Sequence, residues 1–456
     1  MIDLSTVKHI HFIGIGGVSN SAIAQILAKK GFQISGSDQT ASTFTKELEA
    51  LGITIFIGHD KNNVQDAELI VYTSAVSDDN PELLAAQALG LPTLSRAEML
   101  GQLMLGYKNS IAISGTHGKT TTTSMVTRIF NDAKYDPTAL VGGYFEDLKS
   151  NVRIGASDLF ITEACEYKEN FLSFYPKIGV VLNIDEDHLD YFNDLDHIVN
   201  AFVKFAANIE EDGILVLNGD DYNAKKIIPY YKGRIATFGL SDSCDFIAKN
   251  ITYNQKGCAT FDIYIKETLL CRLNLSVPGL HNIYNALGAF ATAAQITEDY
   301  NWISEKLENF KNAGRRFETV GELNGCPVID DYAHHPNEIK ATLDAAARIE
   351  NHGRIICIFQ PHTYSRTKEL LHGFSSAFNL ADEIIVTDIY AAREIDKGEI
   401  HARDLVTELV AENKKSLYMS DFEAIAAYIK EHASSGDLII TMGAGTITEL
   451  SKMLTK

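Results

Sequence analysis

The sequence predicts an α/β protein of three domains, each organised around a largely parallel sheet. Its 456 residues exceed what one ordinary hydrophobic core can organise, so two to four domains are expected. Short apolar runs of strand length alternate with stretches of helical length along the chain, and this alternation is typical of parallel sheets covered by helices. The alternation of strands and helices begins anew near residues 108 and 314, so we expect domains at residues 1–107, 108–313 and 314–456.

Composition narrows the class of protein. The chain is 45% hydrophobic and 22% charged, as globular proteins are. Its formal net charge of −20 argues against a nucleic-acid partner, because phosphate backbones bind clustered basic surface. The six cysteines form no CxxC pair, which favours free thiols in a reducing compartment. The sequence shows neither a signal peptide nor an apolar run of bilayer length, so we expect a cytoplasmic protein without a membrane partner.

The first segment has the pattern of a strand, a glycine turn, a helix and a second strand. The apolar run 10–13 leads into Gly14-Ile15-Gly16-Gly17, and apolar residues at helical spacing follow over 18–27. The second strand ends near Asp38. This unit is of the dinucleotide-binding kind, but Ser19 stands where G-x-G-x-x-G needs its third glycine. An NAD-dependent oxidoreductase is therefore one hypothesis, and a tight turn without a ligand is another.

The second segment holds the strongest chemical motif, residues 115–120 (Gly-Thr-His-Gly-Lys-Thr), between an apolar strand and a helix over 120–130. Glycines let backbone N–H groups approach phosphate oxygens, and a helix N-terminus adds a favourable field. Lys119 supplies a charge for the outer phosphates, and the hydroxyl of Thr120 can join a Mg²⁺ shell. The loop is shorter than a Walker A motif, which would need glycine where Ile113 stands. We expect a nucleotide phosphate site.

Later strands of the same segment can supply a metal site. Glu163 follows the apolar run 159–161, and His188 lies just beyond a further strand. Hard cations prefer oxygen, so Glu163 and Thr120 are the favoured Mg²⁺ ligands, with His188 available for a second ion. As isolated residues, each would be an ordinary polar group of a solvated loop. Over residues 246–277 the pattern changes to short alternating strands, which predicts a small antiparallel sheet attached to the parallel one.

The third segment again alternates buried strands with helices and carries three clusters of functional groups. Arg315 and Arg316 lie at the junction with the second segment, where an arginine can stabilise a transferring phosphoryl group. Residues 330–336 (Asp-Asp-Tyr-Ala-His-His-Pro) follow a strand, and a zinc site there lacks further ligands at recognisable spacing. Residues 360–366 follow another strand end, where open α/β sheets bind ligands.

These motifs occur in the order seen in the Mur ligases, which the sequence resembles from about His11 to Gly445. The motifs are residues 14–17, 115–123, 183–188, 278–282, 314–317, 331–336 and 360–366. The resemblance implies a Rossmann-like first domain that binds a UDP-linked substrate and a central P-loop domain that binds ATP and Mg²⁺. It also implies a Rossmann-like α/β third domain that binds an amino acid and closes over the active site.

The same resemblance implies a role for each matching residue. Lys119, Arg316 and His188 are implied as catalytic, and Thr120, Glu163 and His188 as metal ligands. The implied ATP-binding residues are Gly115, Thr116, His117, Gly118, Lys119, Thr120, Thr121, His281, Asn282, Asn285, Arg316 and Asp331. The implied substrate-binding residues are Gly14, Gly16, Gly17, Asp38, Ser74, Glu166, Tyr332, His334, His335 and Arg366.

The implied reaction is carboxylate activation followed by amide formation, as a step of peptidoglycan precursor synthesis. The lactyl carboxylate of UDP-N-acetylmuramic acid would attack the γ-phosphate of ATP, and the amine of L-alanine would then displace phosphate from the acyl phosphate. Charge neutralisation, in-line positioning and exclusion of water are the physical needs of such a reaction. We expect small-molecule partners only, and a monomer or weak homodimer.

Three positions depart from the family pattern. Thr363 stands where many members carry arginine, which leaves Arg366 as the expected clamp on the substrate. Cys165 stands where an aspartate is frequent. Phe202 stands where related ligases use a carbamylated lysine, and Lys204 lies nearby without an assigned role.

Two further hypotheses stand beside the oxidoreductase. One is a murein-peptide ligase, a family member that joins a preformed tripeptide in place of alanine, although residues 166–171 and 189–192 look more like the alanine-adding branch. The other is a nucleotide-binding regulator without catalysis. The intact set of Lys119, Glu163, His188 and Arg316 argues against a regulator, because a regulator could lose it.

Overall fold

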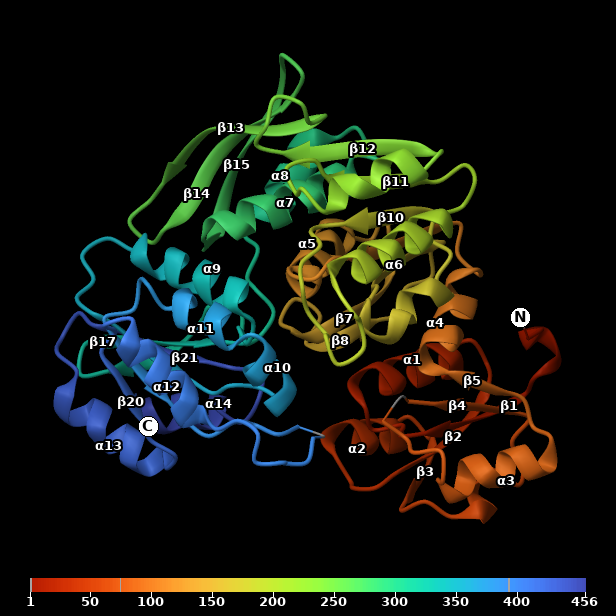
Figure 1. Cartoon of the computed structure of the whole chain (residues 1–456). Helices are drawn as coiled ribbons and strands as arrows, with labels where there is room; N and C mark the ends of the chain where they lie inside the picture. The colour runs from red at the N-terminus through yellow and green to blue at the C-terminus, as the bar shows by residue number, and fades with distance from the viewer. Residues whose placement is uncertain (1, 74, 393) are drawn as a thin grey trace.

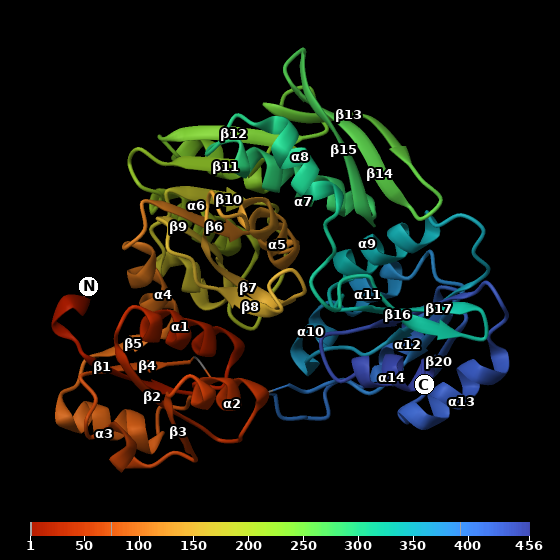
Figure 2. The same cartoon turned by 180° about the vertical axis from the view of Figure 1, so that it is seen from behind.

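The computed structural model describes residues 2–73, 75–392 and 394–456 and shows three α/β domains (Figure 1). Each domain has a sheet of its own. Figures 1 and 2 show the central domain joined to the N-terminal domain on one side and to the C-terminal domain on the other. The predicted fold class, α/β with three sheet-based parts, is confirmed.

The N-terminal sheet has five parallel strands in the order β3-β2-β1-β4-β5, as a Rossmann-like domain requires. The order reverses between β1 and β4, so the loops after these two strands meet at one edge of the sheet. The elements are η1 (Leu4–Thr6), β1 (His9–Ile13), α1 (Val18–Lys29), β2 (Gln33–Asp38), α2 (Thr43–Ala50), β3 (Thr54–Ile57), η2 (Lys61–Val64), β4 (Leu69–Tyr72), α3 (Pro81–Leu89), β5 (Thr93–Ser95) and α4 (Arg96–Met104).

The central sheet has ten strands in the order β15-β14-β13-β12-β11-β10-β6-β9-β7-β8. The predicted antiparallel strands, β13 to β15, pair onto the edge of the parallel strands, so both parts form one sheet. At the other edge β7 and β8 also pair antiparallel. The elements are β6 (Asn109–Ser114), α5 (Lys119–Phe130), β7 (Thr138–Phe145), β8 (Ser150–Arg153), β9 (Leu159–Glu163), η3 (Tyr167–Ser173), β10 (Ile178–Val181), α6 (Leu195–Ala207), β11 (Ile214–Asn218), η4 (Ala224–Tyr230), β12 (Arg234–Gly239), β13 (Phe246–Tyr253), β14 (Cys258–Ile265), β15 (Thr268–Pro278), α7 (Leu280–Ala293) and α8 (Tyr300–Glu308).

The C-terminal sheet has six strands in the order β16-β17-β21-β18-β19-β20, parallel except for the β16–β17 pair. Its functional loops follow β17 and β18, at the carboxyl ends of parallel strands. The elements are β16 (Glu318–Leu323), β17 (Cys326–Asp331), α9 (Pro336–Ala347), β18 (Ile355–Phe359), α10 (Tyr364–Glu369), α11 (Leu371–Ala377), β19 (Glu383–Val386), α12 (Ala402–Ala411), β20 (Ser416–Tyr418), α13 (Phe422–His432), β21 (Leu438–Met442) and α14 (Thr448–Leu454).

The apolar cores join the domains unequally. One buried cluster runs from the N-terminal sheet through Tyr107 into the face of the central sheet covered by α6, where it includes Phe171 and Phe202. The clusters of the C-terminal domain contain residues of that domain alone. Among the described residues, therefore, the N-terminal and central domains share an apolar core, and the C-terminal domain does not share one with either.

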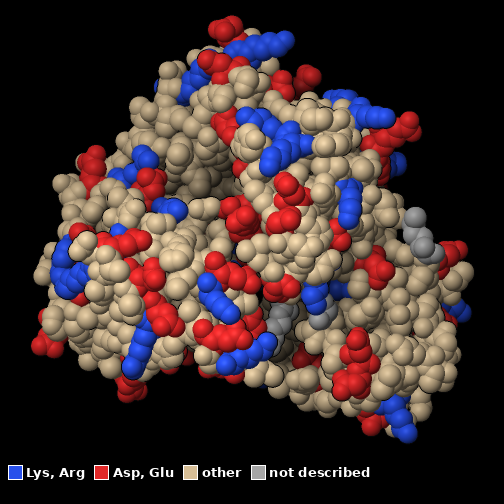
Figure 3. Space-filling view, viewed as in Figure 1, with Lys and Arg blue, Asp and Glu red and all other residues tan. Residues whose placement is uncertain are grey.

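The surface is mixed in charge. Acidic and basic side chains lie side by side over the face shown in Figure 3, within a net charge of −20. All six cysteines are free, as predicted. Within the described chain, no helix combines the length and the apolar character that crossing a membrane requires.

A buried carboxylate ties the strand ends of the N-terminal domain together. Glu82, in the first turn of α3, accepts hydrogen bonds from Ser37 Oγ at 2.5 Å and Asn63 Nδ2 at 2.5 Å, and His59 Nδ1 lies 3.2 Å from it. Burial alone would raise the pKa of Glu82, but its contacts with His11, Ser37 and Asn63 lower it to about 2. The charged carboxylate thus anchors β2 and the loop after β3 to α3.

We expect Glu82→Gln to destabilise the protein at pH 7 by about 3 kcal/mol, because the lowered pKa measures how strongly the fold favours the charged form. The folded pKa lies below the ordinary value of 4.5, so this stabilisation is complete above pH 4.5 and is lost as the pH falls toward 2. Urea unfolding at pH 7 and pH 3 measures it, with the exposed Glu49→Gln as control. A difference from wild type that does not shrink at pH 3 would contradict the assignment.

Candidate active site

Strand β6 leads into the predicted phosphate loop and α5 follows it. Gly115 (φ 140°) and Gly118 (φ 83°) have backbone angles that favour glycine. Asn183 holds the loop, because its carbonyl oxygen accepts from the Thr116 N–H at 3.1 Å and its Oδ1 accepts from the His117 N–H at 2.8 Å. Within the described chain no side chain caps α5, so the first N–H groups of the helix are left for an anion.

The side chain of Lys119 folds back onto this loop. Its Nζ donates to the carbonyl oxygens of Gly115 at 2.5 Å and Thr116 at 3.0 Å, and it lies 2.9 Å from Oε2 of Glu166. Burial alone would lower the pKa of Lys119, but the charge of Glu166 raises it above its ordinary value. Lys119 is therefore a fully charged cation held at the loop.

Glu163 ends β9 beside the loop. Its Oε1 accepts from the N–H of Gly142 at 2.6 Å, and a Cβ at Gly142 would lie 2.5 Å from the same oxygen, so a side chain there would displace the carboxylate. Burial raises the pKa of Glu163, while hydrogen bonding by Gly142 and Thr120 acts in the opposite direction. The structure thus places the predicted oxygen ligands Thr120 and Glu163 next to each other.

His188 lies on the other side of Glu166. Its ring packs on Tyr167 with centroids 4.6 Å apart, and its backbone has a φ of 56°. Nε2 of His188 is 4.0 Å from Oε1 of Glu166, the carboxylate that also contacts Lys119. Glu166, expected from the resemblance to contact the substrate, therefore stands between the loop lysine and the predicted second metal ligand.

A cavity of about 240 Å³ opens beside the loop and takes its wall from the central and C-terminal domains. Burial lowers the pKa of His281 to about 4 and raises the pKa of Asp331 to about 6. Nδ1 of His281 is buried and has no hydrogen-bond partner among the described residues, so it is left for a ligand. The predicted ATP-binding residues that line this cavity are His117, Gly118, Thr121, His281, Asn282, Asn285, Arg316 and Asp331.

The two arginines at the domain junction have different surroundings. Arg315 is tied into the C-terminal domain, because its Nε lies 3.0 Å from Oδ2 of Asp330 and its Nη2 donates to the carbonyl oxygen of Gly443 at 2.5 Å. Arg316 lines the cavity instead, and its charge opposes the effect of burial on the pKa of Asp331. Arg316 is thus the arginine available to a nucleotide.

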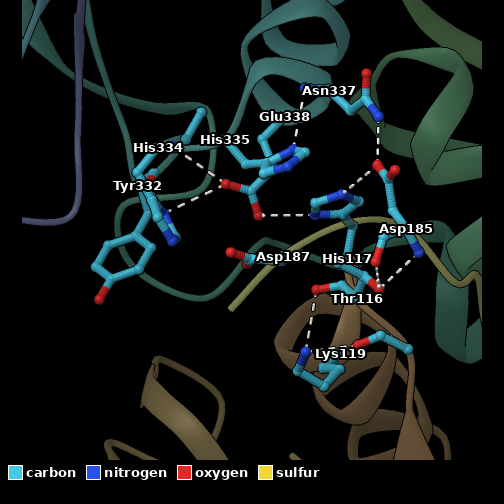
Figure 4. A network of polar contacts seen from close by, with 12 residues as sticks. Thr116, His117, Lys119, Asp185, Asp187, Tyr332, His334, His335, Asn337 and Glu338 are labelled. Carbon is cyan, nitrogen blue, oxygen red and sulfur yellow. Dashed lines mark hydrogen bonds and ion pairs between the residues drawn. The ribbon is translucent and has the colours of Figure 1, made fainter. Parts of the chain in front are cut away.

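A network of polar contacts joins the phosphate loop to the C-terminal domain (Figure 4). Nε2 of His117 lies 3.1 Å from Oδ2 of Asp185, and its Nδ1 lies 3.3 Å from Oε1 of Glu338. Burial alone would lower the pKa of His117, but these two carboxylates raise it to about 9, so the ring is charged at neutral pH. Glu338 also lies 3.3 Å from Nδ1 of His334, and Asn337 donates to Asp185.

His335 adds a second bridge between the same domains, since its Nε2 lies 2.9 Å from the carbonyl oxygen of Glu186. The ligand-type atoms of His117, Asp185 and His335 all lie within 4.8 Å of one another. Glu338 was not singled out from the sequence. Its place in the first turn of α9, directly after the histidine cluster, is the signal that would have identified it.

A second cavity holds three of the predicted substrate residues, Tyr332, His334 and Arg366. Arg366 reaches the central domain, where its Nη2 lies 2.8 Å from Oδ1 of Asp187, and each of the two side chains is 10% exposed. Thr363, at the position of the family arginine, precedes α10 with φ 66° and ψ 145°, a conformation that a β-branched residue rarely adopts. Strain of this kind gathers at functional sites.

The Gly14 loop lies at the carboxyl edge of the N-terminal sheet. Gly14 (φ 78°) donates its N–H to the carbonyl oxygen of Ser37 at 2.8 Å, and Gly16 donates to Oδ2 of Asp38 at 2.9 Å. Asp38 thus supports the loop from β2. Ser74, also expected here, lies outside the described residues.

The other positions that depart from the family pattern lie in the central domain. Nζ of Lys204 lies 2.9 Å from Oε1 of Glu169 at the surface, and Phe202 is buried in the shared core. Cys165 is half buried, and burial raises the pKa of its thiol.

Comparison with known proteins identifies the family. Models of the Mur ligase family catalytic domain, the Mur ligase middle domain and the Mur ligase glutamate ligase domain match residues 9–108, 113–293 and 315–445. The UDP-N-acetylmuramate–L-alanine ligase of Alkaliphilus metalliredigens is 48% identical over 453 residues, which cover 99% of this chain and 98% of the relative. The chain belongs to the Mur ligase family. The ligase of the same name from Clostridium botulinum (strain Loch Maree) is 50% identical over 446 residues, which are 98% of this chain and 97% of that one.

This Mur ligase also matches solved structures along most of its length. The UDP-N-acetylmuramate–alanine ligase of Thermotoga maritima matches with a TM-score of 0.81 and 29% identity, over 98% of each chain. A murein peptide ligase of Psychrobacter arcticus matches with a TM-score of 0.72 and 24% identity, again over 98% of each chain. The second likeness shows a common fold and nothing further.

We expect Glu338→Gln to lower the pKa of His117 from about 9 toward its ordinary value of 6.5, because one of the two carboxylates that stabilise the imidazolium is lost. Since the folded pKa is raised, the charged contact is complete below pH 6.5 and is lost as the pH rises through about 9. NMR titration of labelled histidine measures the shift. Glu350→Gln, at an exposed position beyond the end of α9, is the control, and an unchanged His117 titration in Glu338→Gln would contradict the contact.

Proposed function

We propose that this Mur ligase uses ATP to join L-alanine to the lactyl carboxylate of UDP-N-acetylmuramic acid, a step of peptidoglycan precursor synthesis. The observation that carries the proposal is that Glu338, in the wall of the nucleotide cavity, contacts a residue of each side of the site. Glu338 contacts His117 of the phosphate loop on one side and His334 of the second cavity on the other. Relatives with 48 to 50% identity over nearly the whole chain bear the name of this reaction.

The first half-reaction activates the carboxylate. A lactyl oxygen attacks the γ-phosphorus of ATP, the bond from that phosphorus to the bridging oxygen breaks, and ADP leaves. We assign Lys119 and Arg316 to neutralise the charge of the transferring group, because both are cations at the nucleotide cavity or its loop. The residues that we propose to hold ATP are 115–121, His281, Asn282, Asn285, Arg316 and Asp331.

The second half-reaction forms the amide. The α-amine of L-alanine attacks the acyl carbon, and the tetrahedral intermediate collapses with loss of inorganic phosphate and one proton. We assign Arg366 to the carboxylate of alanine, because Asp187 holds its guanidinium at a cavity that Tyr332 and His334 also line. The polar contacts between the domains close the site and keep water from the acyl phosphate.

The residues at the loop fit a magnesium ion. Thr120 and Glu163 place a hydroxyl and a carboxylate together, and hard cations prefer such oxygen ligands. We assign Thr120, Glu163 and His188 as the ligands and count His188 among the catalytic residues. Bound Mg²⁺ supplies positive charge to the phosphate oxygens during transfer.

The setting of the enzyme is part of the proposal. We place it in the cytoplasm, as a monomer or weak homodimer with domains at 1–107, 108–313 and 314–456, acting in cell-wall formation and hence in cell shape and division. The free cysteines suit a reducing compartment. We assign the UDP part of the substrate to Gly14, Gly16, Gly17, Asp38 and Ser74. We assign the reacting groups of the two substrates to Glu166, Tyr332, His334, His335 and Arg366. The three family models and the relatives described above are ligases, so an NAD-dependent oxidoreductase is not proposed.

We expect purified protein with ATP, Mg²⁺ and UDP-N-acetylmuramic acid to release phosphate in a strictly L-alanine-dependent way. Lys119→Ala should lower kcat at least about 100-fold, because a charge that stabilises the transition state is lost. Lys108→Ala, at an exposed side chain, is the matched control. Phosphate release that needs the tripeptide in place of alanine, or full activity of Lys119→Ala, would contradict the proposal.

We expect Glu163→Gln to raise the Mg²⁺ concentration needed for half-maximal activity about tenfold or more, because a neutral amide is a weaker ligand for a hard cation. Magnesium titration of the assay at saturating ATP measures this requirement. Glu267→Gln, at an exposed turn, serves as control. A wild-type magnesium requirement in Glu163→Gln would remove Glu163 from the metal site.

A further inference from the structure

The N-terminal domain contains one arginine, and its charge has no partner among the described residues. Arg96 is the only arginine among residues 1–107. Its side chain is half buried, and burial lowers the pKa of its guanidinium. Among the described residues no hydrogen bond or ion pair to the Arg96 side chain is present. Partial removal of a charge from water without a partner is unfavourable, and a bound anion would offset that cost.

Arg96 does not serve to begin its helix. Ser95 and Glu98 form the capping box of α4 between them, with Ser95 Oγ accepting from the Glu98 N–H at 3.2 Å. Farther along α4, a Cβ at Gly101 would overlap the carbonyl oxygen of Ser173, so α4 packs closely against the central domain. The local structure is therefore complete without the guanidinium, which remains available to a ligand.

The charge of Arg96 acts on the residue that precedes Glu166. Its charge lowers the pKa of Cys165 against the effect of burial, and the charge of Lys119 acts on the same thiol. Cys165 directly precedes Glu166, the partner of Lys119. Because α4 also contacts η3, which begins two residues after Cys165, Arg96 lies near the segment that carries Glu166.

The sheet order brings the same arginine near the Gly14 loop. β5, which ends just before Arg96, is separated from β1 by β4 alone, so the two strand ends lie about 10 Å apart. Both α1 and α4 begin at this carboxyl edge, and Figure 1 shows both on the side of the sheet that faces the central domain. A nucleotide diphosphate with its attached sugar is long enough to span that distance.

A second unpartnered group lies at the Gly14 loop. Asn20, 1% exposed in the first turn of α1, donates Nδ2 to the carbonyl oxygen of Gly14 at 3.0 Å. Its Oδ1 is buried and has no hydrogen-bond partner among the described residues. The guanidinium of Arg96 and Oδ1 of Asn20, on neighbouring helices, are thus both available to a ligand at one edge of the sheet.

We propose that Arg96 binds an anionic group of the UDP-sugar substrate, either a phosphate of the diphosphate or the lactyl carboxylate. The inference rests on the proposed function and adds a binding residue to it. The planar guanidinium matches either anion through two parallel hydrogen bonds. Bound substrate would supply the charge partner that the described part of the chain does not offer.

Calorimetric titration without ATP tests the proposal with UDP, UDP-N-acetylglucosamine and UDP-N-acetylmuramic acid. We expect Arg96→Gln to bind UDP-N-acetylmuramic acid about 10- to 100-fold more weakly than wild type, the effect of losing a charge-assisted bidentate contact. An equal loss for all three ligands assigns Arg96 to the diphosphate. A loss for UDP-N-acetylmuramic acid alone assigns it to the lactyl carboxylate. Wild-type affinity of Arg96→Gln for all three would overturn the proposal.

Control measurements distinguish a loss of binding at Arg96 from a loss of folding and from a failure of the proposed function. Lys8→Gln removes an exposed charge at the opposite edge of the same sheet and should bind like wild type. The melting temperature of ligand-free Arg96→Gln should not fall, because the charge has no partner to lose. If Arg96→Gln does not fold, Arg96→Lys replaces it, with about tenfold weaker binding expected and wild-type affinity as the contrary result. Failure of the wild-type protein to bind UDP-N-acetylmuramic acid would count against the proposed function itself.

Discussion

The whole arrangement depends on one charged imidazole. His117 belongs to the phosphate loop by sequence, yet its ring lies between a carboxylate of the central domain and one of the C-terminal domain. A loop that merely held phosphate would need only backbone N–H groups and a lysine. Because the loop also carries the contact between domains, its position in the central domain and the placement of α9 are set together. The nucleotide cavity takes its lining from both of these domains.

The unequal cores explain why closure can depend on so few side chains. The N-terminal and central domains share buried apolar surface, and this surface resists separation in proportion to its area. In the described chain the C-terminal domain shares no such cluster with the others, so ion pairs and hydrogen bonds such as Arg366 to Asp187 carry the contact. Polar contacts exchange readily with water, and a domain held by them can open to admit substrates.

Much of this architecture could be predicted from local patterns. The alternation of strands and helices indicated three α/β parts, and the loop before α5 was recognisable because glycines, a lysine and a helix start occur in one short stretch. Glu338 could not be found in this way, since its contact with His117 joins residues 221 positions apart. Local patterns could not choose between Arg315 and Arg316 either, and only the family resemblance indicated Arg316. Arg315 has a φ of 61° and Phe317 a φ of 49°, so neither helical nor strand periodicity describes where these side chains point.

Because the wall of the nucleotide cavity comes from two domains, the measured affinity for ATP depends on the fraction of molecules whose domains are closed. A nucleotide that needs both walls binds only molecules whose domains are closed, so the apparent dissociation constant equals the intrinsic one divided by the closed fraction. Substitutions in the network around His117 therefore alter nucleotide affinity without touching the nucleotide. By the same argument, a compound that occupies the open arrangement opposes ATP by withdrawing closed molecules from the equilibrium.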